Sequence, residues 1–144
     1  MTLLTPQAAG IPLPRATDLT RPFWEACADH RLTYQRCDAC GTAVFDPAPL
    51  CPACRSRDLS WHDSAGRGEI YSWTVAHRPL SPAFTPVYAP IIVTLDEGYR
   101  MVSNLIGCDD SALAVGLRVR VEFHTIASDK VGDVTLPYFR PDGD

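Results

Sequence analysis

The sequence lacks any long apolar run, and its first residues lack the pattern of a secretory leader. The best apolar run, residues 89–93, has the length of a strand and contains Pro90, whereas a helix needs roughly 20 apolar residues to span a bilayer. Residues 1–20 contain no basic segment followed by an apolar one. We therefore expect no membrane span and a cytoplasmic location.

An excess of basic charge is also missing. The chain carries 13 Lys and Arg against 17 Asp and Glu, which gives a formal net charge of −4 at pH 7. Residues 1–60 have six basic and six acidic side chains, whereas residues 61–144 have seven basic and eleven acidic ones. The whole acidic excess thus lies in the second part, which disfavours nucleic-acid binding there, because such binding needs cations that neutralise phosphates.

A nucleophile with a nearby general base is not recognisable in the sequence. Cys27 and Cys108 lack the context of a catalytic cysteine, so we interpret both as buried structural thiols. The adjacent carboxylates Asp96 and Glu97 are predicted to lie in a solvated hairpin turn. The histidines, which lie far from any nucleophile motif, are His30, His62, His77 and His124. We predict no catalytic residue and no activity for the chain alone.

Four of the six cysteines form two CxxC pairs with ten residues between them: Cys37, Cys40, Cys51 and Cys54. Two thiolates on a tight turn can bind one metal ion together, and two such turns complete a tetrahedral site of four sulfurs. Two disulfides are the alternative, which the missing leader and the ordinary composition disfavour. We predict structural zinc, with iron as the less favoured metal, because four cysteines alone do not determine the ion.

The first half of the chain predicts an arm, a helix and a small ribbon. Residues 1–17 hold three prolines and are expected to be an extended arm, not a packed element, that only a partner would order. A helix is predicted over residues 21–31, with Thr20 as its N-cap. Residues 32–61 then form a minimal ribbon whose few apolar residues require metal for stability.

The second half shows short segments of period two that are separated by turn residues. One face of the first predicted strand carries Tyr71 and Trp73, and such a face is typical of a core. The predicted strands cover residues 70–77, 91–95, 100–106, 118–123 and 134–138, with a short helix from Asp109 or Asp110 to Leu113. We predict a mainly β protein with an N-terminal arm (1–19), a helix and zinc ribbon (20–62) and a five-stranded Greek-key OB-fold barrel (63–144).

Several segments, together with the CxxCG and CPxC knuckles, carry a family resemblance. They are PFWEA at residues 22–26, GRGEIYSWTV at 66–75, MVSNLIG at 101–107 and LPYFRP at 136–141. Their order resembles that of acyl-CoA-associated proteins with an N-terminal rubredoxin-like zinc ribbon and an OB-fold domain. The resemblance covers residues 20–141.

The resemblance implies a non-catalytic companion of CoA-thioester enzymes. Such partners are thiolase-like proteins, MaoC-like hydratases and the thiolase-like aldolases of steroid side-chain degradation. The family also implies a hetero-oligomer in which the OB domain holds or passes the CoA thioester and completes the active site of the partner.

A CoA thioester needs a slot for its pantetheine arm and cations for its phosphates. Arg78 and Arg100 are the candidate phosphate ligands. Residues 78–89 form a loop stiffened by prolines, which is more often functional than a plain connection. We expect this loop, with Phe84 and Tyr88, to contact a partner.

Two adjacent aromatic residues of the predicted helix complete the candidate interface. Phe23 and Trp24 need cover from the ribbon, the barrel or a partner subunit, because a helix of three turns cannot bury them alone. An exposed aromatic patch on a small acidic protein often marks an interface. We therefore include both residues among the expected partner contacts.

The alternative function is a nucleic-acid-binding module, because zinc ribbons and OB folds both occur in such proteins. OB domains that bind single strands line their face with cations and stacking aromatics. Tyr71 and Trp73 offer stacking rings, but the barrel half is acidic. A rubredoxin-like electron carrier, the third class, would need no barrel. The charge distribution therefore disfavours nucleic acid, and the CoA-related role is what the resemblance implies.

Overall fold

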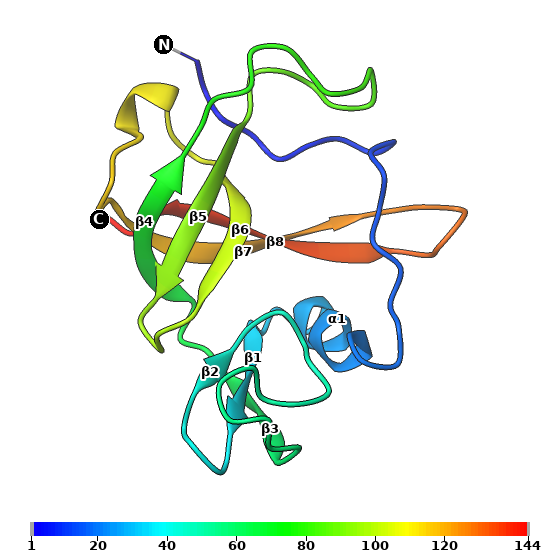
Figure 1. Ribbon diagram of the computed structural model, residues 1–144. Coiled ribbons are helices and arrows are strands. Elements are labelled where there is room, and N and C mark those ends of the chain that lie inside the picture. The colour runs from blue at the N-terminus through cyan, green and yellow to red at the C-terminus, as the bar shows by residue number, and fades with distance from the viewer. Residues whose placement is uncertain (1, 144) are drawn as a thin grey trace.

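Two sheets organise the chain, a three-stranded sheet and a closed five-stranded barrel, as Figure 1 shows for the computed structural model. The structure describes residues 2–143. In chain order the elements are α1 (Arg21–Ala28), β1 (Thr33–Cys37), β2 (Ala43–Val44), β3 (Leu59–Asp63), β4 (Arg67–Trp73), β5 (Ala89–Leu95), β6 (Arg100–Leu105), the 3-10 helix η1 (Asp110–Ala112), β7 (Arg118–Ile126) and β8 (Val134–Pro141). This arrangement confirms the predicted mainly β fold.

The barrel has the strand order β4-β5-β6-β8-β7, and β4 closes it by pairing with β7. Neighbouring strands are antiparallel except β6 and β8, which run parallel and pair only at Leu105 and Phe139 within the described chain. This is the order of an OB fold, as predicted. Alternate residues of β5 fill the interior, where Ile91 and Val93 are at most 1% exposed.

A column of aromatic rings joins the helix, the small sheet and the barrel. The ring centroid of Phe45, which follows β2, lies 5.4 Å from that of Phe23 in α1 and 5.3 Å from that of Tyr99 before β6. Tyr99 stacks on Tyr34 of β1 at 4.9 Å, and Trp24 packs edge-on against Phe23 at 4.9 Å. Each such pair contributes about 0.5–1.5 kcal/mol beyond its buried area, so the column fixes the small sheet against the barrel.

The N-terminal arm is extended, as predicted, but it packs on the barrel without a partner (Figure 1). Leu4 is 1% exposed, and its N–H donates to the carbonyl of Cys108 at 2.8 Å. The carboxamide of Gln7 donates to the Thr85 carbonyl at 3.1 Å and accepts from the Thr85 N–H at 2.8 Å. The prediction of an unpacked arm is wrong, because these contacts join residues about 80 to 100 positions apart that proline content does not reveal.

Helix α1 ends at Ala28, three residues earlier than predicted. His30 adopts the left-handed conformation with φ of 59°, and its N–H donates to the carbonyl of Cys27 at 2.9 Å, which terminates the helix. The side chain of Thr20 does not cap the helix, because its Oγ1 accepts a hydrogen bond from the N–H of Thr17 at 2.9 Å. No helix of the described residues is long and apolar enough to cross a bilayer.

The aromatic face of β4 lies on the outside of the barrel. The strand was predicted over residues 70–77 but spans Arg67–Trp73, with a bulge that leaves Tyr71 between the paired residues Ile70 and Ser72. Tyr71 is 50% exposed and Trp73 is 43% exposed, whereas Ile70 is 1% exposed. The prediction that Tyr71 and Trp73 belong to the core is therefore wrong, since Ile70 takes the inward position and the next residue of the strand, Tyr71, faces out.

The last part of the chain forms a longer hairpin than predicted. β7 pairs with β8 from Val119 with Pro141 to Ile126 with Val134. The helix predicted after Asp109 is a single 3-10 turn that the Asp109 side chain does not cap. The division into an arm (1–19), a helix with a zinc ribbon (20–62) and an OB-fold barrel (63–144) stays a prediction.

Candidate functional site

Four cysteines from two turns meet beside the three-stranded sheet. Cys37 ends β1, Cys40 lies in the turn to β2, and the connection from β2 to β3 supplies Cys51 and Cys54. Their Sγ atoms all lie within 4.8 Å of one another, and all four are free thiols. The structure thus brings the predicted set together without disulfide bonds.

The spacing of the sulfurs suits one tetrahedral ion. The Sγ atoms of Cys37 and Cys54 are 3.6 Å apart, and those of Cys40 and Cys51 are 3.7 Å apart. Four sulfurs at about 2.3 Å from a zinc ion would lie roughly 3.8 Å from each other in a regular tetrahedron. The four side chains therefore fit a metal ion, and the cluster is a candidate metal site.

Each CxxC pair is shaped by a residue in the left-handed conformation. Gly41 has a φ of 79°, and its N–H donates to the carbonyl of Cys37 at 2.8 Å. Arg55 takes the same place after the second pair, with a φ of 65° and a 2.8 Å bond from its N–H to the carbonyl of Cys51. A residue other than glycine has a higher energy in this conformation, so Arg55 makes the second turn less favourable than the first.

The thiols of the cluster have unlike proton affinities. The Thr42 hydroxyl, 3.0 Å from the Cys40 sulfur, and the Thr42 N–H lower the pKa of Cys40 to about 6. The pKa of Cys54 is raised to about 12, because Cys37 and the other sulfurs outweigh the Ser56 N–H that lowers it. Four crowded thiolates repel one another, so a bound cation is what would keep all four deprotonated.

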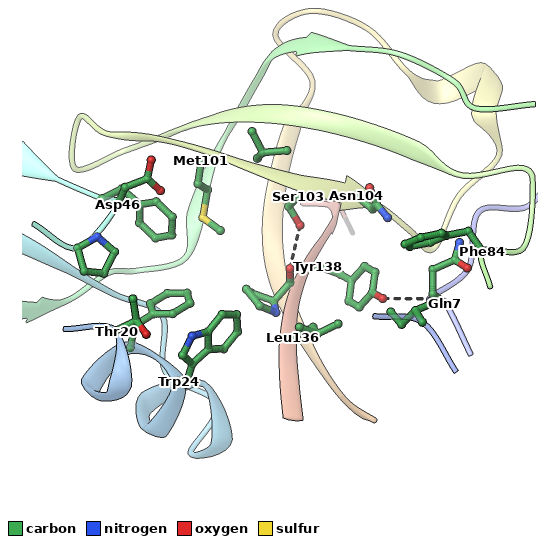
Figure 2. A pocket seen from close by; sticks show the side chains of 16 residues that line it. Gln7, Thr20, Trp24, Asp46, Phe84, Met101, Ser103, Asn104, Leu136 and Tyr138 are labelled. Carbon is green, nitrogen blue, oxygen red and sulfur yellow. Dashed lines mark hydrogen bonds between the residues drawn. The ribbon is translucent and has the colours of Figure 1, made fainter. Parts of the chain in front are cut away.

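An apolar groove of about 450 Å³ follows the seam between β6 and β8. Helix α1 and the connection after β2 form one end, and the arm and the loop after β4 form the other. Figure 2 shows Trp24 and Asp46 at the first end, Gln7 and Phe84 at the second, and Met101 among the side chains between them. The groove therefore brings together segments from the whole length of the chain.

The lining of the groove is apolar and almost uncharged. Of the described residues that line it, Asp46 alone carries a charge, and neither lysine nor arginine contributes. Tyr138 places its hydroxyl in the groove, where it accepts from the Gln7 N–H at 3.3 Å (Figure 2). Burial raises the pKa of Tyr138, so this hydroxyl stays neutral. Such a groove suits an uncharged, partly apolar chain.

The residues predicted as partner contacts gather at this groove. Phe23, Trp24 and Phe84 line it, and the ring of Tyr88 lies 5.9 Å from that of Phe84. Phe23 is only 6% exposed, because Phe45 and the barrel cover it, so the expectation of an exposed aromatic pair fails for this residue. Trp24 remains half-buried. A role of these residues in assembly stays a prediction.

The two predicted phosphate ligands do not meet. Arg100 pairs with Thr94 near one end of β5, and its guanidinium lies 3.7 Å from the ring centroid of Tyr71. Arg78 lies near the other end of β5, because it follows two residues after Ala76, which forms a β-bridge with Tyr88. At about 3.3 Å per residue, Tyr88 and Thr94 are roughly 20 Å apart along the strand. The arginines therefore cannot hold one phosphate together, and neither lines the groove.

Other titratable side chains lie outside the cluster and the groove. Glu122 accepts hydrogen bonds from His124 at 2.7 Å and from Arg140 at 2.8 Å, and both lower the pKa of Glu122. Cys27 is fully buried, as predicted, and burial raises its pKa to about 12. Cys108 is only half-buried, so the prediction of a buried thiol is wrong for this residue, although its burial still raises its pKa.

Sequence reasoning missed the residues along the seam. Met101 and Val102 lie within MVSNLIG, and Leu136 and Pro137 lie within LPYFRP, two segments whose sequences predict strands and the family resemblance but no groove. Pro137 was the available signal, because a proline inside a strand indicates an edge that is not paired. The pairing of β6 with β8 at a single position is the structural counterpart of that signal.

Two family models match consecutive parts of the chain. The ChsH2 rubredoxin-like zinc ribbon domain matches residues 24–60, and the ChsH2 C-terminal OB-fold domain matches residues 61–124. Among solved structures, the chain is similar to "Ltp2-ChsH2(DUF35) aldolase", with a TM-score of 0.78 and 37% identity over 91% of this chain and all of that one.

Curated relatives include subunits and scaffold proteins. The "Probable enoyl-CoA hydratase alpha subunit" of Thermomonospora curvata is 42% identical over 83% of this chain, and the "3-oxo-4,17-pregnadiene-20-carboxyl-CoA hydratase alpha subunit" of Mycobacterium tuberculosis is 33% identical over 76%. This chain spans only about a third of those proteins, 36% and 35% of their lengths.

A relative of similar size is the "DUF35 domain-containing scaffold protein" of Methanocaldococcus jannaschii, which is 30% identical over 74% of this chain and 78% of its own length. The ribbon with its four cysteines, the closed barrel and the match to a solved chain along its entire length agree with one another. This protein therefore belongs to the ChsH2-type DUF35 family, with a rubredoxin-like zinc ribbon followed by an OB-fold domain.

Proposed function

We propose that this chain is a non-catalytic partner subunit of an acyl-CoA enzyme of the hydratase, aldolase or thiolase-like type. Its role is to assemble with that enzyme as a scaffold and to hold the CoA thioester beside the active site. The relatives are named as hydratase subunits, as scaffold proteins and as part of an aldolase, which supports assembly with such enzymes. The observation that carries the proposal is the apolar groove along the β6–β8 seam.

In this proposal the groove binds the CoA thioester, and the loop after β4 contacts the partner enzyme. The groove offers an uncharged slot of about 450 Å³, large enough for part of a CoA thioester. The loop after β4 presents Leu80, which is 94% exposed, together with the half-buried Phe84 and Tyr88. An exposed leucine at a loop tip beside partly covered aromatics is a surface that a protein partner can bury.

The test is co-expression with a hydratase or aldolase from the same genomic neighbourhood, followed by size-exclusion chromatography with mass measurement. We expect a stable hetero-oligomer, and turnover of enoyl-CoA or β-hydroxyacyl-CoA only when the enzyme is present. Leu80→Asp should lower the fraction of the chain that co-elutes with the enzyme at least tenfold, because it puts a charge into the contact. Val115→Asp is the matched control, since Val115 is 72% exposed outside this loop. Turnover by the isolated chain would contradict the proposal.

We propose zinc as the ion of the cysteine cluster and the cytoplasm as its compartment. Two pairs of sulfurs 3.6 Å and 3.7 Å apart, with all four within 4.8 Å, suit zinc, and free thiols persist in a reducing compartment. Native mass spectrometry and elemental analysis should find one zinc per chain. A red protein with visible thiolate-to-metal bands would assign iron instead.

Nucleic-acid binding is the competing function, and the surface charges disfavour it. On the outer faces of β4 and β7, Arg67 and Arg118 are paired with Asp142 and Asp96 at 3.4 Å and 3.0 Å. Arginines neutralised in this way attract phosphates less. We expect no measurable binding of fluorescent single-stranded DNA or RNA by anisotropy at physiological salt. Tight binding with a steep dependence on salt would replace the acyl-CoA proposal.

A further inference from the structure

The groove exposes an unpaired strand edge. Leu95 of β5 donates its N–H to the Tyr99 carbonyl at 2.8 Å, on the side of β6. The Pro90 carbonyl accepts instead from Thr74, on the side of β4. The backbone N–H and C=O groups of odd-numbered residues of β5 therefore point toward β6. Ile92 is the partner of Val102 in the register. Because backbone groups alternate along a strand, the N–H and C=O of Val102 point away from β5 and toward the seam.

Strand β8 does not satisfy these groups. The register joins β6 to β8 only at Leu105 and Phe139, beyond the groove. On the β8 side of the groove lies Pro137, which has no N–H. Its carbonyl already accepts a hydrogen bond from the Ser103 hydroxyl at 2.8 Å (Figure 2). The facing strand therefore offers no backbone partner to the N–H and C=O of Val102, and the groove around them is largely apolar.

An open backbone edge in an apolar groove is a binding feature for amides. A donor and an acceptor on one strand can bond an extended chain that carries secondary amides, as in the addition of a strand to a sheet. The acyl-pantetheine arm of a CoA thioester is such a chain, since it is uncharged and carries two amides. The nucleotide end is anionic, and among the described residues that line the groove Asp46 alone is charged, with a sign that repels phosphate.

We propose that the groove binds the acyl-pantetheine arm and that the N–H and C=O of Val102 bond one of its amides. The proposal rests on the proposed function, which supplies the thioester as ligand. The carboxamide of Asn104, two residues along β6 on the same wall, is the adjacent polar group for the second amide (Figure 2). The phosphates then lie outside the groove, which explains why neither Arg78 nor Arg100 lines it.

Val102→Pro tests the edge directly, with Val102→Ala as the matched control. The Val102 side chain is 72% exposed, so alanine removes little packing and keeps the N–H. Proline removes an N–H that does not pair with β5 and is tolerated at strand edges. By calorimetry on the full chain, pantetheine should bind Val102→Pro about 5- to 10-fold more weakly than Val102→Ala, the effect of one lost hydrogen bond.

Equal binding by the proline and alanine variants would overturn the role of the edge, and displacement of pantetheine by 3′,5′-ADP would overturn the assignment of the groove to the arm. Should Val102→Pro melt well below Val102→Ala, pantetheine methylated on both amide nitrogens provides the same test on wild type, with the same expected loss. Measurements on the co-purified complex separate the two proposals. A complex that forms without pantetheine binding contradicts this inference alone, whereas binding by a chain that never assembles contradicts the proposed function alone.

Discussion

Removal of the metal should unfold the three-stranded sheet while the barrel stays folded. The small sheet has few buried apolar side chains of its own, and a structural zinc site supplies on the order of 10 kcal/mol or more. The barrel interior holds many fully buried side chains of its own, among them Ile91, Leu105 and Phe139, which are at most 1% exposed. Hydrogen exchange after chelation should show loss of protection in residues 33–63 and retained protection in residues 89–95.

The same treatment should damage the groove. Phe45 and Pro47 form part of its wall, and they lie in the connection between β2 and the Cys51 knuckle. The carboxamide of Gln35 holds this connection by accepting from the Ala48 N–H at 2.8 Å. When the knuckle opens, the wall loses its support, so pantetheine binding should fall at least tenfold by calorimetry.

Cys51→Ser should reproduce the effect of chelation, because Cys51 is fully buried in the cluster. Cys108→Ser is the control, since Cys108 is a half-buried thiol outside the cluster. Retained exchange protection in residues 33–63 of the metal-free protein would show that the aromatic column holds the small sheet without the ion. In that case the cysteines are dispensable for the fold.

Local patterns predicted the parts of this fold that depend on neighbours in sequence. The CxxC spacing identified the cysteine cluster, because two residues between thiols fix a turn whatever the rest of the chain does. Alternation of period two identified the five barrel strands in their correct order, but not β3 of the small sheet. Boundaries were less accurate, as at His30, where a left-handed residue other than glycine ends the helix.

Features that depend on distant contacts were not predictable from those patterns. The groove exists because Pro137 faces β6 across the seam, and no local pattern reveals which strand lies opposite. The outward position of Tyr71 follows from the pairing of its neighbour Ile70 with the buried Val93 of β5, and the packing of Leu4 depends on a contact with Cys108, far along the chain. Each of these required the strand register before a side chain could be assigned to core, surface or site.

Gly68→Ala should destabilise the barrel by about 3 kcal/mol or more. Gly68 pairs with Leu95 of β5 on one side and with Val119 of β7 on the other, so it lies where the barrel closes. A Cβ at this position would overlap the Thr94 carbonyl oxygen and would lie 2.9 Å from the Thr94 carbonyl carbon and 3.0 Å from the Leu95 Cα. These are backbone atoms of a central strand, and they cannot move without breaking the ladder.

Urea unfolding measures the effect, and Gly143→Ala is the matched control. A Cβ on Gly143 meets nothing within 4 Å, so this variant should stay within about 0.5 kcal/mol of wild type. Because the groove is built on β6 and β8 of the same barrel, the Gly68 variant should also lose pantetheine binding, even with the metal bound. Chelation should thus disrupt the groove by unfolding the small sheet, and Gly68→Ala by destabilising the barrel. Only the glycine variant should remove the exchange protection of β5. An unchanged urea midpoint for Gly68→Ala would mean that β4 and β5 lie farther apart at this pair than the closed barrel requires.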